Sequence, residues 1–137
     1  MSKVLLDTNI LIYSIDEESK YFQQAHSLFL NPHLELYTTA KNISEFLAVV
    51  TRAPKPALSL DDALKVIDDF ETALTILYPT PKSYTLFRQL LSAYKPKGLN
   101  IHDFEIISIG LANQITEFAT LNKKDFEKVN EINIHPY

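Results

Sequence analysis

The sequence predicts an α/β fold in which helices cover both faces of a mostly parallel sheet. Short apolar runs typical of strands alternate along the chain with segments whose apolar residues recur at helical spacing. This alternation is the pattern of strand–helix–strand crossovers, which join parallel strands. With 137 residues, the chain has the length of one domain, residues 1–137, that can bury its own core.

Five apolar runs rich in β-forming residues are expected to be strands, in the order Val4–Leu6, Leu34–Tyr37, Thr75–Tyr78, Phe118–Leu121 and Ile132–Ile134. Six segments with helical periodicity lie between them: Asn9–Ile15, Tyr21–Leu30, Asn42–Thr51, Leu60–Leu74, Ser83–Tyr94 and Ile101–Gln114. Ser59, three residues before Asp62, predicts the start of the fourth helix. The last helix is apolar on nearly all sides, which predicts that it is buried.

Composition excludes several kinds of site. The chain has no Cys, which excludes disulfides, zinc–thiolate sites, iron–sulfur clusters and cysteine nucleophiles. Two glycines, Gly98 and Gly110, are too few for a Walker loop or a dinucleotide fingerprint. The net charge of −4 argues against a protein that binds nucleic acid with its whole surface, but it allows an acidic site with a local basic rim.

The first residues predict no targeting signal. The apolar run Val4-Leu5-Leu6 is too short for a signal peptide or a membrane span. Because the chain also lacks Cys, we expect a cytoplasmic protein with no membrane partner.

Three acidic residues lie where strands end or helices begin. Asp7 follows the first expected strand, at the edge where open α/β sheets bind ligands, although it could instead cap the next helix. Glu45 and Asp103 each come three residues after an Asn, which is also the spacing of a capping box. Asn122 and Asp125 follow the strand Phe118–Leu121 in the same way.

Clustered carboxylates repel one another strongly, so the pattern is best explained by a divalent cation that neutralises them. Mg²⁺ and Mn²⁺ prefer oxygen ligands, and a cation of this kind activates water and stabilises charge on a phosphodiester. Hydrolysis of a nucleic-acid backbone is the reaction that fits this pattern.

These residues resemble the four successive motifs of PIN-domain ribonucleases. The motifs are Leu-Leu-Asp7-Thr8-Asn9, Asn-Ile-Ser44-Glu45-Phe, Ile-His102-Asp103 and Thr120-Leu-Asn122-Lys-Lys-Asp125. They occur in order over nearly the whole chain and are most similar to the VapC-type toxins of toxin–antitoxin pairs. The resemblance implies a PIN-like three-layer α/β/α sandwich that acts as an Mg²⁺- or Mn²⁺-dependent endoribonuclease, a hydrolase of RNA phosphodiester bonds.

The resemblance also implies roles for individual residues. Asp7 and Asp103 match the acids that bind the metal ion, and Glu45 would complete the site or position the attacking water. Asn122 stands where many members have an acid, so we expect it to hydrogen-bond water or substrate and the site to hold one ion. Whether Asp125 supplies the missing charge or caps a short helix stays open.

Other polar residues near the motifs have weaker assignments. Asn9 and Ser44 match neighbours that would orient the acids. His102 could orient a carboxylate or transfer a proton, or be an ordinary residue at a helix start. The cations that flank the motifs could contact phosphates or simply be solvated; they are Lys41, Arg52, Lys55, Lys95, Lys97, Lys123 and Lys124.

The resemblance implies RNA as the substrate, an antitoxin protein as a partner, and a homodimer. Aromatic residues recur at helical spacing in the first two helices, which predicts core packing or, alternatively, a groove for a partner helix. These residues are Tyr13, Tyr21, Phe22 and Phe29.

Two other functions remain open from the sequence. Asp7 could be a nucleophile that forms an aspartyl phosphate, but Asn9 replaces the second acid that haloacid-dehalogenase-like enzymes carry. The chain could also be a catalytically inert PIN-like binding module, and Asn122 is the feature that favours this alternative.

Overall fold

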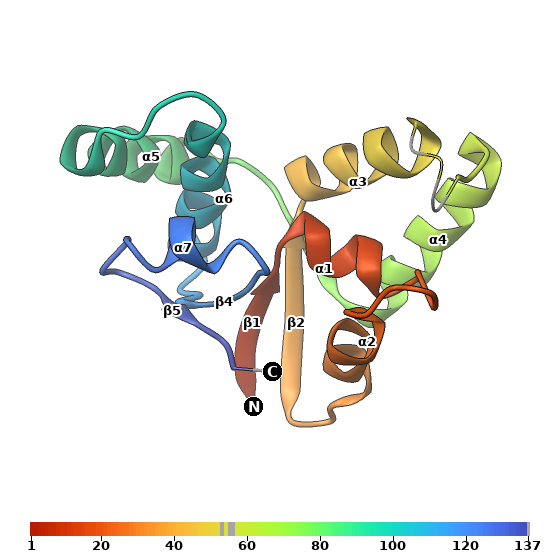
Figure 1. Cartoon of the computed structure of the whole chain (residues 1–137). Helices are drawn as coiled ribbons and strands as arrows, with labels where there is room; N and C mark the ends of the chain where they lie inside the picture. Colours follow the sequence, from red (N-terminus) through yellow and green to blue (C-terminus); the bar gives the residue numbers. More distant parts are fainter. Residues whose placement is uncertain (53, 55–56, 137) are drawn as a thin grey trace.

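A parallel sheet forms the centre of the computed structural model, which describes residues 1–52, 54 and 57–136 (Figure 1). Its strands lie in the order β3-β2-β1-β4-β5, and all neighbouring strands are parallel. In the central strand β1, Val4 lies opposite Leu36 of β2 and opposite Glu117 of β4. The strands are β1 (Ser2–Leu6), β2 (Leu34–Thr39), β3 (Thr75–Leu77), β4 (Glu117–Ala119) and β5 (Asn133–Ile134).

Helices connect the successive strands. They are α1 (Thr8–Tyr13), α2 (Phe22–Leu30), α3 (Ala40–Arg52), α4 (Leu60–Ala73), α5 (Pro81–Tyr94), α6 (Asn100–Ala112) and α7 (Lys123–Phe126). Over the residues that the structure describes, no helix has both the length and the apolar character that crossing a membrane requires.

The helices form two layers, one on each face of the sheet. Val4 and Leu6 of β1 pack into a core formed with α1, α2, α3 and α4, whereas Leu5 packs into a second core formed with α5, α6 and α7. Figure 1 shows these two groups of helices on opposite sides of the strands. Because successive side chains of a strand point to opposite faces, one apolar run supplies both cores. The predicted three-layer α/β/α sandwich is confirmed.

The helix α6 packs closely on the sheet at Gly110. A Cβ atom at this position would lie 2.5 Å from Cζ of Phe118 on β4 and 3.1 Å from Cδ1 of Leu5 on β1. Glycine therefore allows a closer approach between helix and strands than a larger residue would. Most of α6 is buried, as its apolar sequence predicts, although Ile101 in the first turn is 37% exposed.

Most helices begin one or two residues away from the expected start. The helix α3 begins at Ala40 and α6 begins at Asn100, so both Asn42 and Asn100 lie within their helices and neither precedes its helix as the alternative of a capping box requires. The helix start at Ser59 is confirmed, because its side chain accepts a hydrogen bond of 3.1 Å from the backbone N–H of Asp62.

The order of the strands creates a switch point beside β1. The chain passes from β1 to β2 and β3 on one side of the sheet, and only then to β4 and β5 on the other. Ligands in open α/β sheets bind at the carboxyl ends of the strands at such a point. Asp7 and Thr120 directly follow β1 and β4 there.

Candidate active site

Asp7 is held at the carboxyl end of β1 by neighbours on three elements. Its Oδ1 accepts hydrogen bonds from the backbone N–H of Thr8 at 2.8 Å and from Nδ2 of Asn42 at 3.3 Å. Its Oδ2 accepts from the hydroxyl of Thr120 at 2.7 Å. The side chain is only 7% exposed, so Asp7 both caps α1 and presents a fixed carboxylate.

Asn42 is the buried residue that connects Asp7 to the end of β2. It is fully buried, and besides Asp7 its Nδ2 donates to Oγ1 of Thr8 at 2.9 Å. Its Oδ1 accepts from Oγ1 of Thr39 at 2.6 Å, which fixes the orientation of the amide. Among the described residues, no buried side-chain nitrogen or oxygen lacks a hydrogen-bond partner. The rotamer of Asp7 is therefore set by its surroundings.

Asp103 lies on the first turn of α6, across the switch point from Asp7. Its Oδ2 accepts a hydrogen bond of 3.3 Å from Nδ2 of Asn122, the residue that precedes α7. The backbone N–H of Asn122 in turn donates to Oγ1 of Thr120 at 3.0 Å. Thr120 and Asn122 thus connect the two predicted metal ligands.

The acids are close enough to repel one another. Burial, followed by the charges of Asp7, Asp125 and Glu45 in decreasing order, raises the pKa of Asp103 to about 7. Burial also raises the pKa of Asp7, against hydrogen bonds from Thr120, Thr8 and Asn42 that lower it, and the charge of Glu45 adds to the increase. A negative potential therefore accumulates at this edge of the sheet.

The residues present fit a divalent cation of the Mg²⁺ type. The donors are carboxylate oxygens, and Oδ2 of Asp7 accepts one hydrogen bond, which leaves a lone pair for a ligand. In the described part of the chain, no three His, Cys, Asp or Glu side chains are arranged as a complete ligand set. A site built on Asp7 and Asp103 would therefore rely on the one or two protein carboxylates that Mg²⁺ usually takes, with water and substrate phosphate as the other ligands.

The other predicted site residues lie in different surroundings. Glu45 and Ser44 are exposed on α3, and Asn42 rather than Ser44 orients Asp7. Asn9 does not contact Asp7 through a hydrogen bond; its Oδ1 accepts from the backbone N–H of Leu121 at 3.3 Å and so fixes the segment after β4. His102 is exposed at the start of α6.

Asp125 lies on α7, near one acid, Asp103, and one cation, Lys128. It contributes to the raised pKa of Asp103, and its Oδ1 is 3.9 Å from Nζ of Lys128. Its side chain is 29% exposed. Asp125 is therefore a negative charge beside Asp103, and Asn122, not Asp125, makes the hydrogen bond to it.

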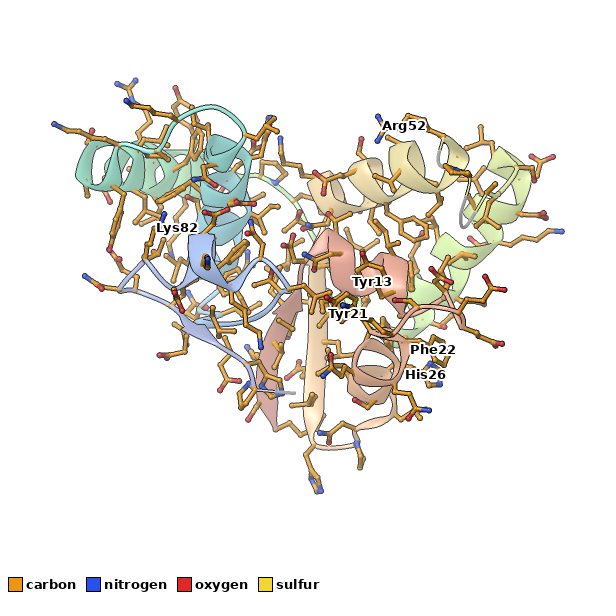
Figure 2. All side chains as sticks on the ribbon, in the orientation of Figure 1. Tyr13, Tyr21, Phe22, His26, Arg52 and Lys82 are labelled. Carbon is orange, nitrogen blue, oxygen red and sulfur yellow. The ribbon has the colours of Figure 1, made fainter. Side chains whose placement is uncertain are left out.

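The predicted cations do not form one continuous rim. Lys41 of α3 pairs with Glu105 of α6 at 2.9 Å, which links the two helices that carry site acids. Arg52 ends α3, at the opposite end of that helix from Lys41 (Figure 2). Lys55 lies outside the described residues. The remaining cations lie between α5 and α6 or on α7: Lys95, Lys97, Lys123 and Lys124.

The aromatic residues of the first two helices are half-buried rather than fully in the core. The rings of Tyr13 and Tyr21 have centroids 5.1 Å apart, and Phe22 stacks on His26 at 5.0 Å (Figure 2). Phe29 lies against Phe70 of α4 and contributes to the core on that face.

Sequence reasoning missed Asn42 and Thr120 as residues of the site. Asn42 had the position of a helix cap, and Thr120 was expected within a strand. The signal that could have found them is a polar side chain near the end of an expected strand, since β2 and β4 both end at the edge where Asp7 lies.

Comparison with solved structures shows the same fold in toxin–antitoxin proteins. VapBC2 from Rickettsia felis, solved with a DNA fragment from its promoter, has a TM-score of 0.71 at 20% identity, over 98% of each chain. VapBC-1 from nontypeable Haemophilus influenzae has a TM-score of 0.73 at 20% identity, over 97% of this chain and 96% of that chain.

A third similar structure is VapC20 from Mycobacterium tuberculosis, described as a Sarcin-Ricin loop cleaving toxin. It has a TM-score of 0.72 at 10% identity, over 91% of this chain and 94% of that chain. No curated protein matches the chain. The PIN domain profile, however, matches residues 4–132, which include all four motifs. The chain therefore belongs to the PIN domain family.

Proposed function

We propose that this protein is a metal-dependent endoribonuclease and the toxin of a toxin–antitoxin pair. The observation that carries the proposal is the pair Asp7 and Asp103, two carboxylates from different parts of the chain at the switch point, where the charge of Asp7 helps to raise the pKa of Asp103. Crowded acids of this kind are stabilised by a divalent cation, and nucleases use such a cation for phosphodiester hydrolysis.

Asp7 and Asp103 would hold one Mg²⁺ or Mn²⁺ ion, with Glu45 at the open side of the site. When bound, the cation would lower the pKa of water and stabilise negative charge on the phosphate. Among the protein's own groups, Thr120 and Asn42 keep Asp7 in place. We expect Glu45, which is exposed, to orient the attacking water or to accept a proton from it.

Asn122 has a role that an acid could not fill. Its amide donates to Asp103, so the carboxylate stays oriented without a further negative charge in the cluster. Fewer charges favour one cation over two, because each extra metal ion needs its own neutralising ligands. The amide oxygen of Asn122 remains available to a water molecule or to the substrate.

The decisive experiment compares RNA cleavage by the parent protein and by Asp7→Asn. We expect the parent to cleave a structured RNA with Mg²⁺ or Mn²⁺ and to lose this activity with EDTA. The Asp7→Asn protein should fold normally, because Asn keeps a similar shape and an acceptor oxygen, yet its cleavage rate should fall by at least ~100-fold.

The matched control is Asp61→Asn, which makes the same chemical change at an exposed position of α4. It should cleave like the parent, and both variants should come from the same purification, so that a contaminating ribonuclease is recognised. Equal cleavage by Asp7→Asn and parent would contradict the proposal. Absence of both cleavage and metal binding would instead favour an inert binding module.

We also propose that the antitoxin docks on the face formed by α1, α2 and α4. A cavity of about 200 Å³ opens there among Ser14, Ile15, His26, Phe29 and Phe70. The aromatic pairs Tyr13–Tyr21 and Phe22–His26 border the same helices, so an apolar helix face of a partner would find complementary surface.

This partner assignment is tested with the product of an adjacent small gene, where one exists. We expect that product to inhibit cleavage, and His26→Glu to weaken its binding by at least ~10-fold without changing cleavage by the free protein. Unchanged inhibition of His26→Glu would place the antitoxin elsewhere.

The homodimer is likewise a proposal. Leu60 and Leu64 lie one turn apart on α4 and are 58% and 45% exposed, which favours a further contact on this helix. Light scattering of the purified protein tests this directly, and a monomer at all accessible concentrations would contradict it.

A further inference from the structure

A cavity lies beside the candidate acids, between the end of α5, the start of α6 and α7. Its volume is about 330 Å³, which falls within the range of about 300–1,000 Å³ that is usual for small-ligand sites. Aromatic, amide and cationic side chains contribute to its lining, among them Tyr94, Lys95, Lys97, Asn100, Phe104 and Lys128.

The cavity shares its elements with the acids. Asn100 and Phe104, which line it, stand on either side of Asp103 in the first turns of α6. Asp125, which also lines it, belongs to α7, and the residue that precedes this helix, Asn122, donates a hydrogen bond to Asp103. A polymeric substrate bound at the acids could therefore extend into this cavity over a short distance.

The charge of the cavity differs from that of the whole molecule. The protein carries a net charge of −4, yet three lysines and one acid line this cavity. Lys128 pairs with Asp125 at 3.9 Å. Lys95 and Lys97 are exposed and form no ion pair with an acid in the described part of the chain. These two cations are therefore available to a phosphate.

An aromatic surface forms another part of the lining. The rings of Tyr94 and Phe104 have centroids 5.7 Å apart and are tilted by 46°. The hydroxyl of Tyr94 donates to Oε1 of Glu131 at 2.5 Å and accepts from the backbone N–H of Asn130 at 2.9 Å. These bonds hold the ring in place, so a base could stack on it at little entropic cost.

We propose that this cavity binds one nucleotide of a single-stranded RNA next to the phosphate that is cleaved. Lys95 and Lys97 contact its phosphate, and Tyr94 supports its base. The proposal rests on the proposed function and deepens it, since it specifies how the substrate is held beyond the acids. Lysines give affinity without sequence specificity, whereas the shape of the cavity restricts which base fits.

The test measures binding of a short fluorescent single-stranded RNA by anisotropy in an Asp7→Asn background, which prevents cleavage. We expect Lys95→Gln/Lys97→Gln to weaken binding about three- to ten-fold at low salt. The slope of log Kd against log salt should fall by about 0.7 for each phosphate contact that is lost. Lys65→Gln is the matched control, because Lys65 is 80% exposed on α4, on the opposite side of the sheet (Figure 1).

Variants of Tyr94 test the aromatic contact separately. Tyr94→Leu should weaken RNA binding about five-fold or more and leave the salt dependence unchanged, because it removes stacking and no charge. Tyr94→Phe keeps the ring and should bind within about two-fold of the parent. Thermal unfolding of each variant shows whether a loss of binding has a structural cause.

Kinetics with the cleavage-competent protein separate this proposal from the proposed function. The double lysine variant should raise KM and leave kcat unchanged. If Asp7→Asn cleaves as fast as the parent, the proposed function fails. If Asp7→Asn is inactive and the lysine variants match Lys65→Gln in Kd and KM, the nucleotide site is overturned. The nucleotide site is also overturned if the lysine variants weaken the binding of a protein partner but not the binding of RNA.

Discussion

At the scale of single residues, the hydroxyl of Thr120 joins the two halves of the site. It donates to Asp7 and accepts from the backbone of Asn122, so it acts on both sides of the switch point. Thr120 is fully buried, and valine has nearly the same shape without the hydroxyl. Its replacement therefore isolates the contribution of the hydrogen bonds.

We expect Thr120→Val to lower the free energy of unfolding by about 1–3 kcal/mol, since buried polar groups lose their partner. It should also weaken Mn²⁺ binding by about 10–100-fold, because Asp7 loses the bond that orients it. Urea denaturation and calorimetric titration measure the two effects. Thr85→Val removes an exposed hydroxyl on α5 and should change stability by less than about 0.5 kcal/mol. If Thr120→Val had the same free energy of unfolding and the same Mn²⁺ affinity as Thr85→Val, this would contradict the role of the Thr120 hydroxyl.

The raised pKa of Asp103 predicts a pH dependence of stability. The carboxyl ionises near 3.8 in the unfolded chain, whereas burial and the nearby acids raise the pKa to about 7 in the folded protein. Between these values the folded state binds more protons than the unfolded state, so the metal-free protein becomes less stable as pH rises from about 4 to about 7.

Asp103→Asn removes the loss of stability that ionisation of Asp103 causes in the folded protein. Its Tm should exceed that of the parent by a few degrees at neutral pH; the difference should be small near pH 4 and disappear below it, where Asp103 is protonated in both states. Differential scanning calorimetry without divalent metal measures this. Asp61→Asn should show no such difference at either pH, and a Tm gap of equal size at both pH values would contradict the prediction.

At the scale of elements, the close contact between α6 and the sheet depends on Gly110. We expect Gly110→Ala to lower the free energy of unfolding by about 1–2 kcal/mol, because the clash with Phe118 outweighs the ~1 kcal/mol gain in helix propensity. Ser92→Ala, on the exposed side of α5, should be neutral or slightly stabilising. Chemical denaturation checks both, and a Gly110→Ala protein as stable as the parent would show that Phe118 moves without cost.

Local patterns in the sequence predicted most of the elements but not all of their starts. Apolar runs and helical periodicity located the strands and six helices, because both depend on residues close together in the chain. The spacing of Asn42 and Glu45 also allowed a capping box, but Asn42 lies inside α3 and hydrogen-bonds Thr8 and Asp7, more than 30 residues away. Hydrogen bonds of this range leave no periodic signal.

The same limit applies to the candidate site. Asp7 and Asp103 could be placed at the edge of the sheet, since strand ends and helix starts are local features. The roles of Asn42, Thr120 and the cavity at Tyr94 depend on the order of the strands and on how α5, α6 and α7 pack, and neither follows from one sequence. That Asn122 donates to Asp103 likewise became visible only in three dimensions.

At the scale of the whole molecule, a cation at the switch point would link both helical layers. A ligand that binds only the folded state stabilises it by about 2.7 kcal/mol at 100 times its Kd. Mn²⁺ should therefore raise the Tm of the parent by several degrees, and more at pH 7.5 than at pH 5, where protonated Asp103 binds metal poorly. Thermal scans with and without Mn²⁺ test this, with Asp7→Asn/Asp103→Asn as the variant that should not respond. An equal shift in that variant would place the cation elsewhere.

The position of β1 between β2 and β4 also bears on synthesis of the chain. Asp7 leaves the ribosome 113 residues before Thr120, whose hydroxyl donates to its Oδ2. A nascent chain that ends before β4 can pair β1 with β2, yet it lacks one wall of the acid cluster. If the protein cleaves RNA, a nascent chain thus gains this activity only after β4 and Thr120 have been synthesised.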